Sequence, residues 1–187
     1  MTPAKVGACL WLLCFQFFVA EQFARMGWTG HYSMRRDYIS DLGALRCPPG
    51  CSSLHWVMNG SFMLQGFLIF FGAVLLHRLL PRVAVILLAI AGLGVLVVGL
   101  FPEDTNARLH VQGAAANFLG GNLAIILLAK RWRNWITFAA SSIGLLATLV
   151  LAFHGMGPDT GTVERLAAYP LPLILSWSGW RMLRTNP

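Results

Sequence analysis

Apolar residues fall into six long runs separated by short polar segments, and this pattern extends over the whole chain. A helix needs about 20 apolar residues to cross a hydrocarbon core about 30 Å thick, so each run has the length of one membrane crossing. The six predicted helices cover approximately residues 6–24, 54–76, 83–101, 109–129, 135–153 and 163–180. The pattern therefore predicts an all-α fold, a polytopic membrane helix bundle with about six transmembrane helices in a single domain over residues 1–187.

Prolines mark the ends of one predicted helix and interrupt another. Pro81 and Pro102 bracket the third helix, where a residue without an N–H group does least harm. Pro170 and Pro172 lie inside the sixth range, so we expect a kink there.

Composition agrees with a membrane protein, because 57% of the residues are hydrophobic and only 11% are charged. The net charge of +7 could indicate nucleic-acid binding. The basic residues are instead scattered between apolar runs and form no polar face, so nucleic acid is excluded as a partner. We expect a multi-pass protein of a cell membrane, either an inner or a plasma membrane.

The distribution of basic residues predicts the orientation, because cytoplasmic loops accumulate Lys and Arg. One side carries eight basic residues and no acid: Lys5, Arg78, Arg82, Lys130, Arg131, Arg133, Arg181 and Arg184. Both termini are therefore predicted to be cytoplasmic. The longest loop, residues 26–53, then lies outside, and long loops are where function is most often found.

Candidate catalytic residues gather on this outer side in three separate segments. Ser40 and Asp41 lie in the long loop, His110 near the start of the fourth helix, and Glu164 near the start of the sixth. The acids and the histidine could transfer protons, and the hydroxyl could act as a nucleophile. The alternative is structural, since such residues also cap helices, form turns and pair with arginines.

A second set could bind an anionic lipid headgroup. Arg35, Arg36 and Arg165 carry the forked donors that match phosphate oxygens, although they could pair with Asp37, Asp41 and Glu164 instead. The polar residues expected near this site are Tyr38, Asn59 and Asn117. The two asparagines could equally join helices through hydrogen bonds within the membrane.

Metal and disulfide chemistry are also conceivable at this face. His110, His154 and Asp104 are residue types that bind zinc or iron, which makes zinc a candidate cofactor, but no pair of histidines has a diagnostic ligand spacing. Cys47 and Cys51 flank a Pro-Pro-Gly turn and are a candidate disulfide if the exterior is oxidising.

Several short motifs occur in an order that resembles a known family. They are Tyr32-Ser33, Ile39-Ser40-Asp41-Leu42-Gly43, Gly99-Leu100-Phe101-Pro102-Glu103-Asp104, His110 and Glu164-Arg165. The chain resembles the prokaryotic membrane proteins known as domain of unknown function 998, and this likeness implies six helices without implying an activity. The Ser-Asp-x-Gly element is more remotely similar to the Frag/DRAM/Sfk family, which implies a link to lipid remodelling. A third comparison is the alkaline ceramidase and adiponectin-receptor superfamily. This chain has six predicted helices rather than seven and lacks the paired histidines of that superfamily, so no residue role is carried over from it.

Two hypotheses about function remain open. In the first, the outer site binds or modifies a lipid headgroup, and an enzyme of this kind would be a lipid hydrolase or transferase, with or without a metal. In the second, the chain is a non-catalytic accessory subunit or a small transporter, whose polar residues only fix the outer loops. Membrane lipids are the expected partners, and the sequence identifies no protein partner.

Overall fold

The computed structural model describes residues 1–46, 51–154 and 159–185, with only the backbone of His154. These residues form helices α1 (Pro3–Leu13), α2 (Gln16–Met26), α3 (His55–Leu75), α4 (Arg82–Leu100), α5 (Ala107–Trp132), α6 (Trp135–His154), α7 (Thr160–Ala168) and α8 (Pro170–Arg184), and the short 3₁₀ helix η1 (Ser40–Gly43). The predicted all-α membrane bundle is confirmed, because five spans are long and apolar enough to cross a membrane.

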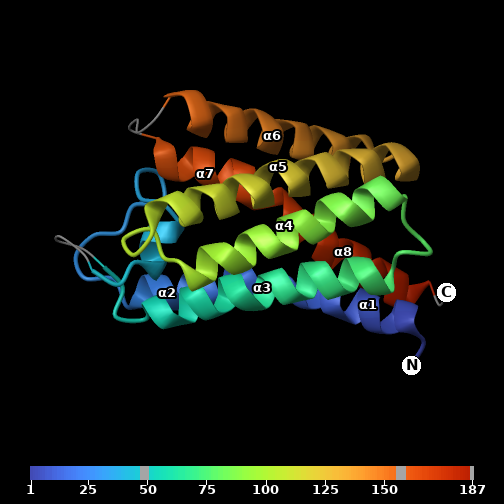
Figure 1. The fold of residues 1–187 in the computed structure, drawn as a ribbon, viewed down its shortest axis with the longest axis horizontal. Coiled ribbons are helices and arrows are strands. Elements are labelled where there is room, and N and C mark those ends of the chain that lie inside the picture. The colour runs from blue at the N-terminus through green and yellow to red at the C-terminus, as the bar shows by residue number, and fades with distance from the viewer. Residues whose placement is uncertain (47–50, 155–158, 186–187) are drawn as a thin grey trace.

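The helices run roughly along one axis, with both termini at the same end (Figure 1). Helix α4 lies between α3 and α5, α1 packs on α3 and α8, and α6 packs on α5 and α7. The loop that follows α2 lies at the opposite end from the termini (Figure 1). Both termini lie at the same end because the chain passes along the bundle an even number of times. The location of this end in the cytoplasm stays a prediction.

Two of the predicted helices are each divided into two. The first span, Pro3–Met26, is interrupted at Cys14 and Phe15, where the Phe15 and Phe17 amides bond to carbonyls three residues earlier rather than four. The range predicted as 163–180 corresponds to α7 followed by α8. Pro170 begins α8, because its missing N–H does no harm in a first turn. The kink expected at Pro170 and Pro172 is therefore a break at Tyr169 between two helices, α7 and α8.

Glycines allow the central helices to approach closely. A Cβ atom on Gly94 of α4 would lie 2.5 Å from the Gly113 carbonyl oxygen of α5, and one on Gly113 would lie 2.6 Å from the Gly94 oxygen. Helix packing inside a membrane depends on such close backbone contact, because lipid tails are as apolar as the side chains. The α4–α5 contact fixes the start of α5, which carries His110.

The loop between α2 and α3 (residues 27–54), which we call loop one, is described over residues 27–46 and 51–54, and these parts fold back over the end of the bundle (Figure 1). Its two ends meet at an antiparallel bridge between Trp28 and Ser52, and the Ser52 hydroxyl donates to the Ala24 carbonyl at 2.5 Å. In its middle, Ile39 and Leu42 are 1% and 0% exposed and belong to the core of the bundle. Loop one is therefore anchored at its ends and at its centre.

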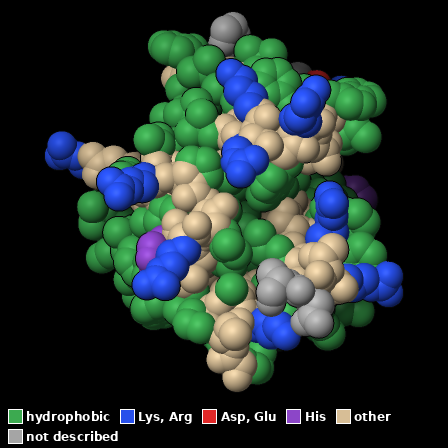
Figure 2. All heavy atoms as spheres, turned by 90° about the vertical axis from the view of Figure 1, so that its right-hand side faces the viewer, with side chains coloured by type: hydrophobic (Ala, Val, Ile, Leu, Met, Phe, Trp, Pro, Cys, Tyr) green, Lys and Arg blue, Asp and Glu red, His purple; other side chains and the backbone are tan. Residues whose placement is uncertain are grey.

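The end that carries the termini is strongly basic. Its connections and helix ends contain the eight Lys and Arg residues of the predicted cytoplasmic side and no Asp or Glu. Figure 2 shows these basic side chains around the face, separated by apolar and neutral groups. The acids of the chain belong to the other half of the molecule.

Candidate functional site

Helix η1 places Ser40 and Asp41 over the end of the bundle opposite the termini (Figure 1). Ile39 and Leu42, three residues apart, point into the core, so the two polar residues between them lie at its edge. The amide of Asn59 on α3 donates to the Gly43 carbonyl at 2.8 Å, and a Cβ atom on Gly43 would lie only 2.2 Å from the Asn59 Oδ1 atom. This contact fixes the end of η1. Asn59 therefore joins α3 to η1.

Asp41 and Glu103 form a pair of carboxyl groups beside Ser40. The Ser40 hydroxyl donates to Glu103 Oε2 at 3.0 Å, and Asp41 accepts a hydrogen bond from the Tyr38 amide at 2.7 Å. Burial, together with its hydrogen bond to Glu103, raises the pKa of Asp41 to about 7. Asp41 can therefore hold a proton near neutral pH and share it in its hydrogen bond with Glu103.

Glu164 reaches the same region from α7. Its side chain is 7% exposed, and its carboxylate accepts hydrogen bonds from the backbone amides of Ile39 and Ser40. Glu164 thus holds the start of η1 rather than capping its own helix. The bond ties two segments that are 125 residues apart in the sequence.

His110 completes the group from α5. Its Nδ1 atom lies 2.9 Å from the carbonyl oxygen of Phe101, and its side chain is 6% exposed. A carbonyl accepts but cannot donate, so the geometry assigns a proton to Nδ1. In the neutral imidazole, Nε2 then has a free lone pair and can accept a proton or a hydrogen bond.

Two hollows meet at Ser40, His110 and Glu164. The first is a cavity of about 40 Å³ inside the bundle, whose polar lining also includes Gln65 and Asn117. Gln65 Nε2 is buried without a hydrogen-bond partner among the described residues, and the nearby Cys14 thiol is only a weak acceptor. A space of this size holds roughly three water molecules, and the Gln65 amide, with only a weak acceptor nearby, could donate a hydrogen bond to one of them.

The second hollow is an open groove of about 510 Å³ between α5 and α6. Its walls are apolar along Val111, Ala115 and Leu119 of α5 and along Leu149 and Phe153 of α6. Val111 and Phe153 are 63% and 80% exposed, so the groove opens on the outer surface of the bundle. Its polar residues are Tyr38, Ser40, Glu103, His110, Thr148 and Glu164.

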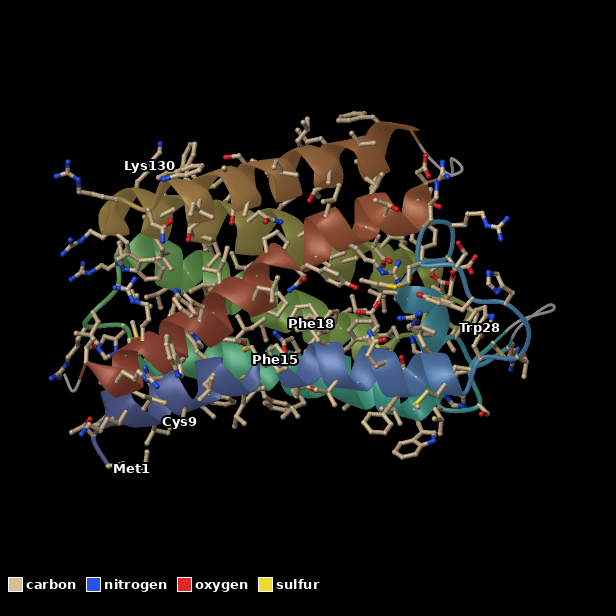
Figure 3. All side chains as sticks on the ribbon, turned by 180° about the vertical axis from the view of Figure 1, so that it is seen from behind. Met1, Cys9, Phe15, Phe18, Trp28 and Lys130 are labelled. Carbon is tan, nitrogen blue, oxygen red and sulfur yellow. The ribbon has the colours of Figure 1, made fainter. Side chains whose placement is uncertain are left out.

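A buried ion pair holds loop one to the helices beside this site. Arg165 of α7 lies 3.0 Å from Glu21 of α2, whose side chain is fully buried, and the Tyr169 hydroxyl donates to the same carboxylate at 2.8 Å. Arg165 also donates to the Tyr32 hydroxyl and to the carbonyls of Met34, Asp37 and Gly161. We call Glu21, Tyr32, Arg165 and Tyr169 the arginine clamp. In Figure 3, polar side-chain atoms lie at both ends of the bundle, Trp28 marks the end described here, and Phe15 and Phe18 lie in the middle.

The sequence did not identify this clamp. The expected partners of the arginines were Asp37, Asp41 and Glu164, but the observed pairs are Arg165 with Glu21 and the exposed Arg35 with Asp159. The expected partners were wrong because those three carboxyl groups accept bonds from backbone amides or from other acids. A useful signal was the acid at position 21 inside an apolar run, which requires a buried partner.

The predicted headgroup arginines do not line the α5–α6 groove. Arg35 and Arg165 line a separate, mostly apolar groove between α6 and α7–α8, and Arg36 is exposed. Tyr38 lines this groove, whereas Asn117 lines the inner cavity and donates to the Ala91 carbonyl at 3.0 Å. Asn117 therefore both joins α5 to α4 and contributes to a polar cavity.

No group of three potential metal ligands occurs among the His, Cys, Asp and Glu residues that the structure describes. Asp104 accepts hydrogen bonds from the amides of Leu45 and Arg46, and the side chain of His154 lies outside the described part. Cys51 is disulfide-bonded, while Cys47 lies outside the described residues, so its pairing stays a prediction.

Comparison with curated proteins and with solved structures finds no match to this chain. One family does match, described as "Protein of unknown function (DUF998)", and its sequence model covers residues 6–181. This is nearly the whole bundle, from α1 to α8. The chain therefore belongs to the DUF998 family of proteins.

Proposed function

We propose that this membrane protein binds an amphiphile, with a hydrocarbon chain in the α5–α6 groove and a polar headgroup at Ser40, His110 and Glu164. The observation that carries the proposal is the junction of an open apolar groove with a buried polar cluster. Pockets for small ligands typically measure 300–1,000 Å³ and combine apolar walls with a few polar groups. The groove of about 510 Å³ fits that description.

The dimensions of the groove suit part of one lipid chain. From His110 to Leu119, α5 rises about 14 Å at 1.5 Å per residue. The groove therefore begins at the polar end of the bundle and extends into the outer half of the bilayer. A lipid could enter sideways from the membrane, because Val111 and Phe153 are exposed at its mouth.

The polar end favours a headgroup that donates hydrogen bonds. The described residues that line the groove include Glu103 and Glu164 but neither Lys nor Arg. Carboxylates accept from hydroxyl and amine groups and repel phosphate. We therefore infer a headgroup rich in hydroxyl groups or carrying an amine, in place of the phosphate that the three arginines alone would indicate.

Hydrolysis of the bound lipid is the second candidate, and it rests on the inner cavity. Water beside Gln65 would lie in a cavity that shares His110 and Glu164 with the groove. The free Nε2 atom of His110 could accept a proton from such a water molecule. The competing account, a bundle whose polar residues only fix the outer loops, explains the arginine clamp but leaves the groove without a role.

Native mass spectrometry of the detergent-purified protein tests the proposal. The probes are lipids with identical chains and either a glucosyl, an ethanolamine or a phosphate headgroup. We expect one bound glucosyl or ethanolamine lipid per chain, and loss of this adduct when Ala115→Trp fills the groove. Ala140→Trp is the matched control, because Ala140 lines a different groove, between α6 and α7–α8. Equal binding to both variants and to wild type would refute the proposal.

A further inference from the structure

A second polar pocket lies at the opposite end of the bundle, where the termini are. It measures about 290 Å³ and is formed where the end of α5 and the start of α6 meet α8. Its polar lining consists of Asn134, Thr137, Ser178, Arg181 and Thr185, and its apolar lining of Trp132, Trp177 and Met182. It is separate from the α5–α6 groove and shares no lining residue with it.

The charge of this pocket is positive. Arg181 is exposed and lines it, and the segments around it contribute Lys130, Arg131, Arg133 and Arg184. No acid occurs in residues 130–137 or 177–187 of the sequence. Figure 2 shows this end of the molecule with its basic side chains turned to the surface. An anion that enters would therefore meet positive charge without competition from carboxylates.

Neutral donors lie deeper in the pocket. Thr137 and Ser178 are 9% and 7% exposed, and neither hydroxyl has a hydrogen-bond partner among the described residues. The start of α6 also lies here, since Asn134 accepts from the Thr137 amide at 3.1 Å in the first turn. Asn134 thus caps the Thr137 amide, and the helix start contributes the positive end of its dipole. Arg181, the two hydroxyls and this helix start thus surround one space.

We propose that this pocket binds the phosphate of an anionic phospholipid. Phosphate oxygens match a guanidinium group, hydroxyl donors and a helix N-terminus better than any other common membrane group. The apolar lining favours a lipid over a free ion, because Trp177 is 54% exposed and tryptophan prefers the level of the headgroups. Basic pockets between helices are known to hold anionic headgroups on the cytoplasmic side.

The general tendency of cytoplasmic loops to be basic explains the overall charge but does not explain this pocket. A diffuse charge effect depends on the number of basic residues, whereas a pocket depends on Arg181 in particular. Arg78 provides the comparison, because it is exposed at the same end in the α3–α4 connection and does not line the pocket. Removing either residue changes the net charge by the same amount.

The test is a titration of the purified protein by native mass spectrometry with phosphatidylglycerol, phosphatidylcholine of the same chains, and inorganic phosphate. We expect phosphatidylglycerol to bind more tightly than phosphatidylcholine, and Arg181→Gln to weaken its binding by about tenfold or more. Arg78→Gln should leave the affinity nearly unchanged. Thr137→Val, which keeps the shape and removes the hydroxyl, should weaken binding by about two- to tenfold.

Three outcomes would overturn the inference. Equal losses in Arg181→Gln and Arg78→Gln would show diffuse charge attraction, and equal binding of the two lipids would show that the phosphate charge is not recognised. Competition by inorganic phosphate as strong as by phosphatidylglycerol would show a site for a free anion. None of these results bears on the α5–α6 groove, so both proposals can fail or succeed separately.

Discussion

The arginine clamp should be the largest single contributor to the attachment of loop one, and Glu21→Gln tests this. The substitution keeps the size of the side chain but leaves the Arg165 charge buried without its counter-charge, since Glu21 is 0% and Arg165 6% exposed. Removing one partner of a buried ion pair costs about 3–5 kcal/mol. Because each kcal/mol shifts the melting temperature of a chain of this size by about 2–4 °C, we expect a decrease of roughly 6–20 °C.

The assay is thermal unfolding in detergent, followed by intrinsic tryptophan fluorescence, with a double-mutant cycle. Arg165→Met alone should also destabilise strongly, because it leaves the Met34, Asp37 and Gly161 carbonyls without their donor. The double variant should lose less stability than the sum of the single losses, by about 2 kcal/mol, because neither charge is then left unpaired.

The exposed ion pair provides the control. Arg35 and Asp159 are 71% and 48% exposed in their side chains, so Asp159→Asn should leave the melting temperature within experimental error. If Glu21→Gln melted like wild type, or if the two single losses added without coupling, the clamp would not have the stabilising role described above.

Two further predictions concern the neighbourhood of the site. Burial raises the pKa of Asp41 to about 7, above its ordinary value near 4, so between these values the folded state retains a proton that the unfolded chain loses. The melting temperature should therefore fall as pH rises from about 4 to about 7 and then level off. Asp41→Asn should flatten this dependence, and an unchanged slope would contradict a proton-sharing pair. Gly161→Ala should destabilise the protein, because its Cβ would lie 2.3 Å from the Asp37 carbonyl oxygen, whereas Gly60→Ala, with nothing within 4 Å, should stabilise α3 by up to about 1 kcal/mol. Melting temperatures of the two alanine variants in the reverse order would contradict this account of loop one.

Much of the fold could be predicted from the sequence because the bilayer imposes a length and a polarity on every span. The charge-free run 83–101 and the flanking prolines predicted α4 nearly to its ends, Arg82–Leu100. The division of the first span at Cys14 and Phe15 could not be predicted, because neither residue breaks a helix by itself. It depends on contacts with other helices, as in the hydrogen bond of Gln16 to Gln65 at 3.1 Å.

The residues of the candidate site could be predicted more readily than the partners to which they bond. The sequence predicts Ser40, His110 and Glu164 as polar residues at one membrane level, and the structure brings them together around the groove. The sequence does not indicate that Glu103 bonds to Ser40 and Asp41, or that Glu21 pairs with Arg165. These pairs join segments more than 60 residues apart, and no local pattern in the sequence specifies them.

The most direct test of amphiphile binding is photo-crosslinking in membranes with a lipid that carries a diazirine in its acyl chain. The account predicts adducts concentrated on Val111, Ala115, Leu119 and Leu149, at the walls of the α5–α6 groove, and their loss in Ala115→Trp but not in Ala140→Trp. Adducts spread evenly over all lipid-facing helices, with the same pattern in both variants, would contradict it.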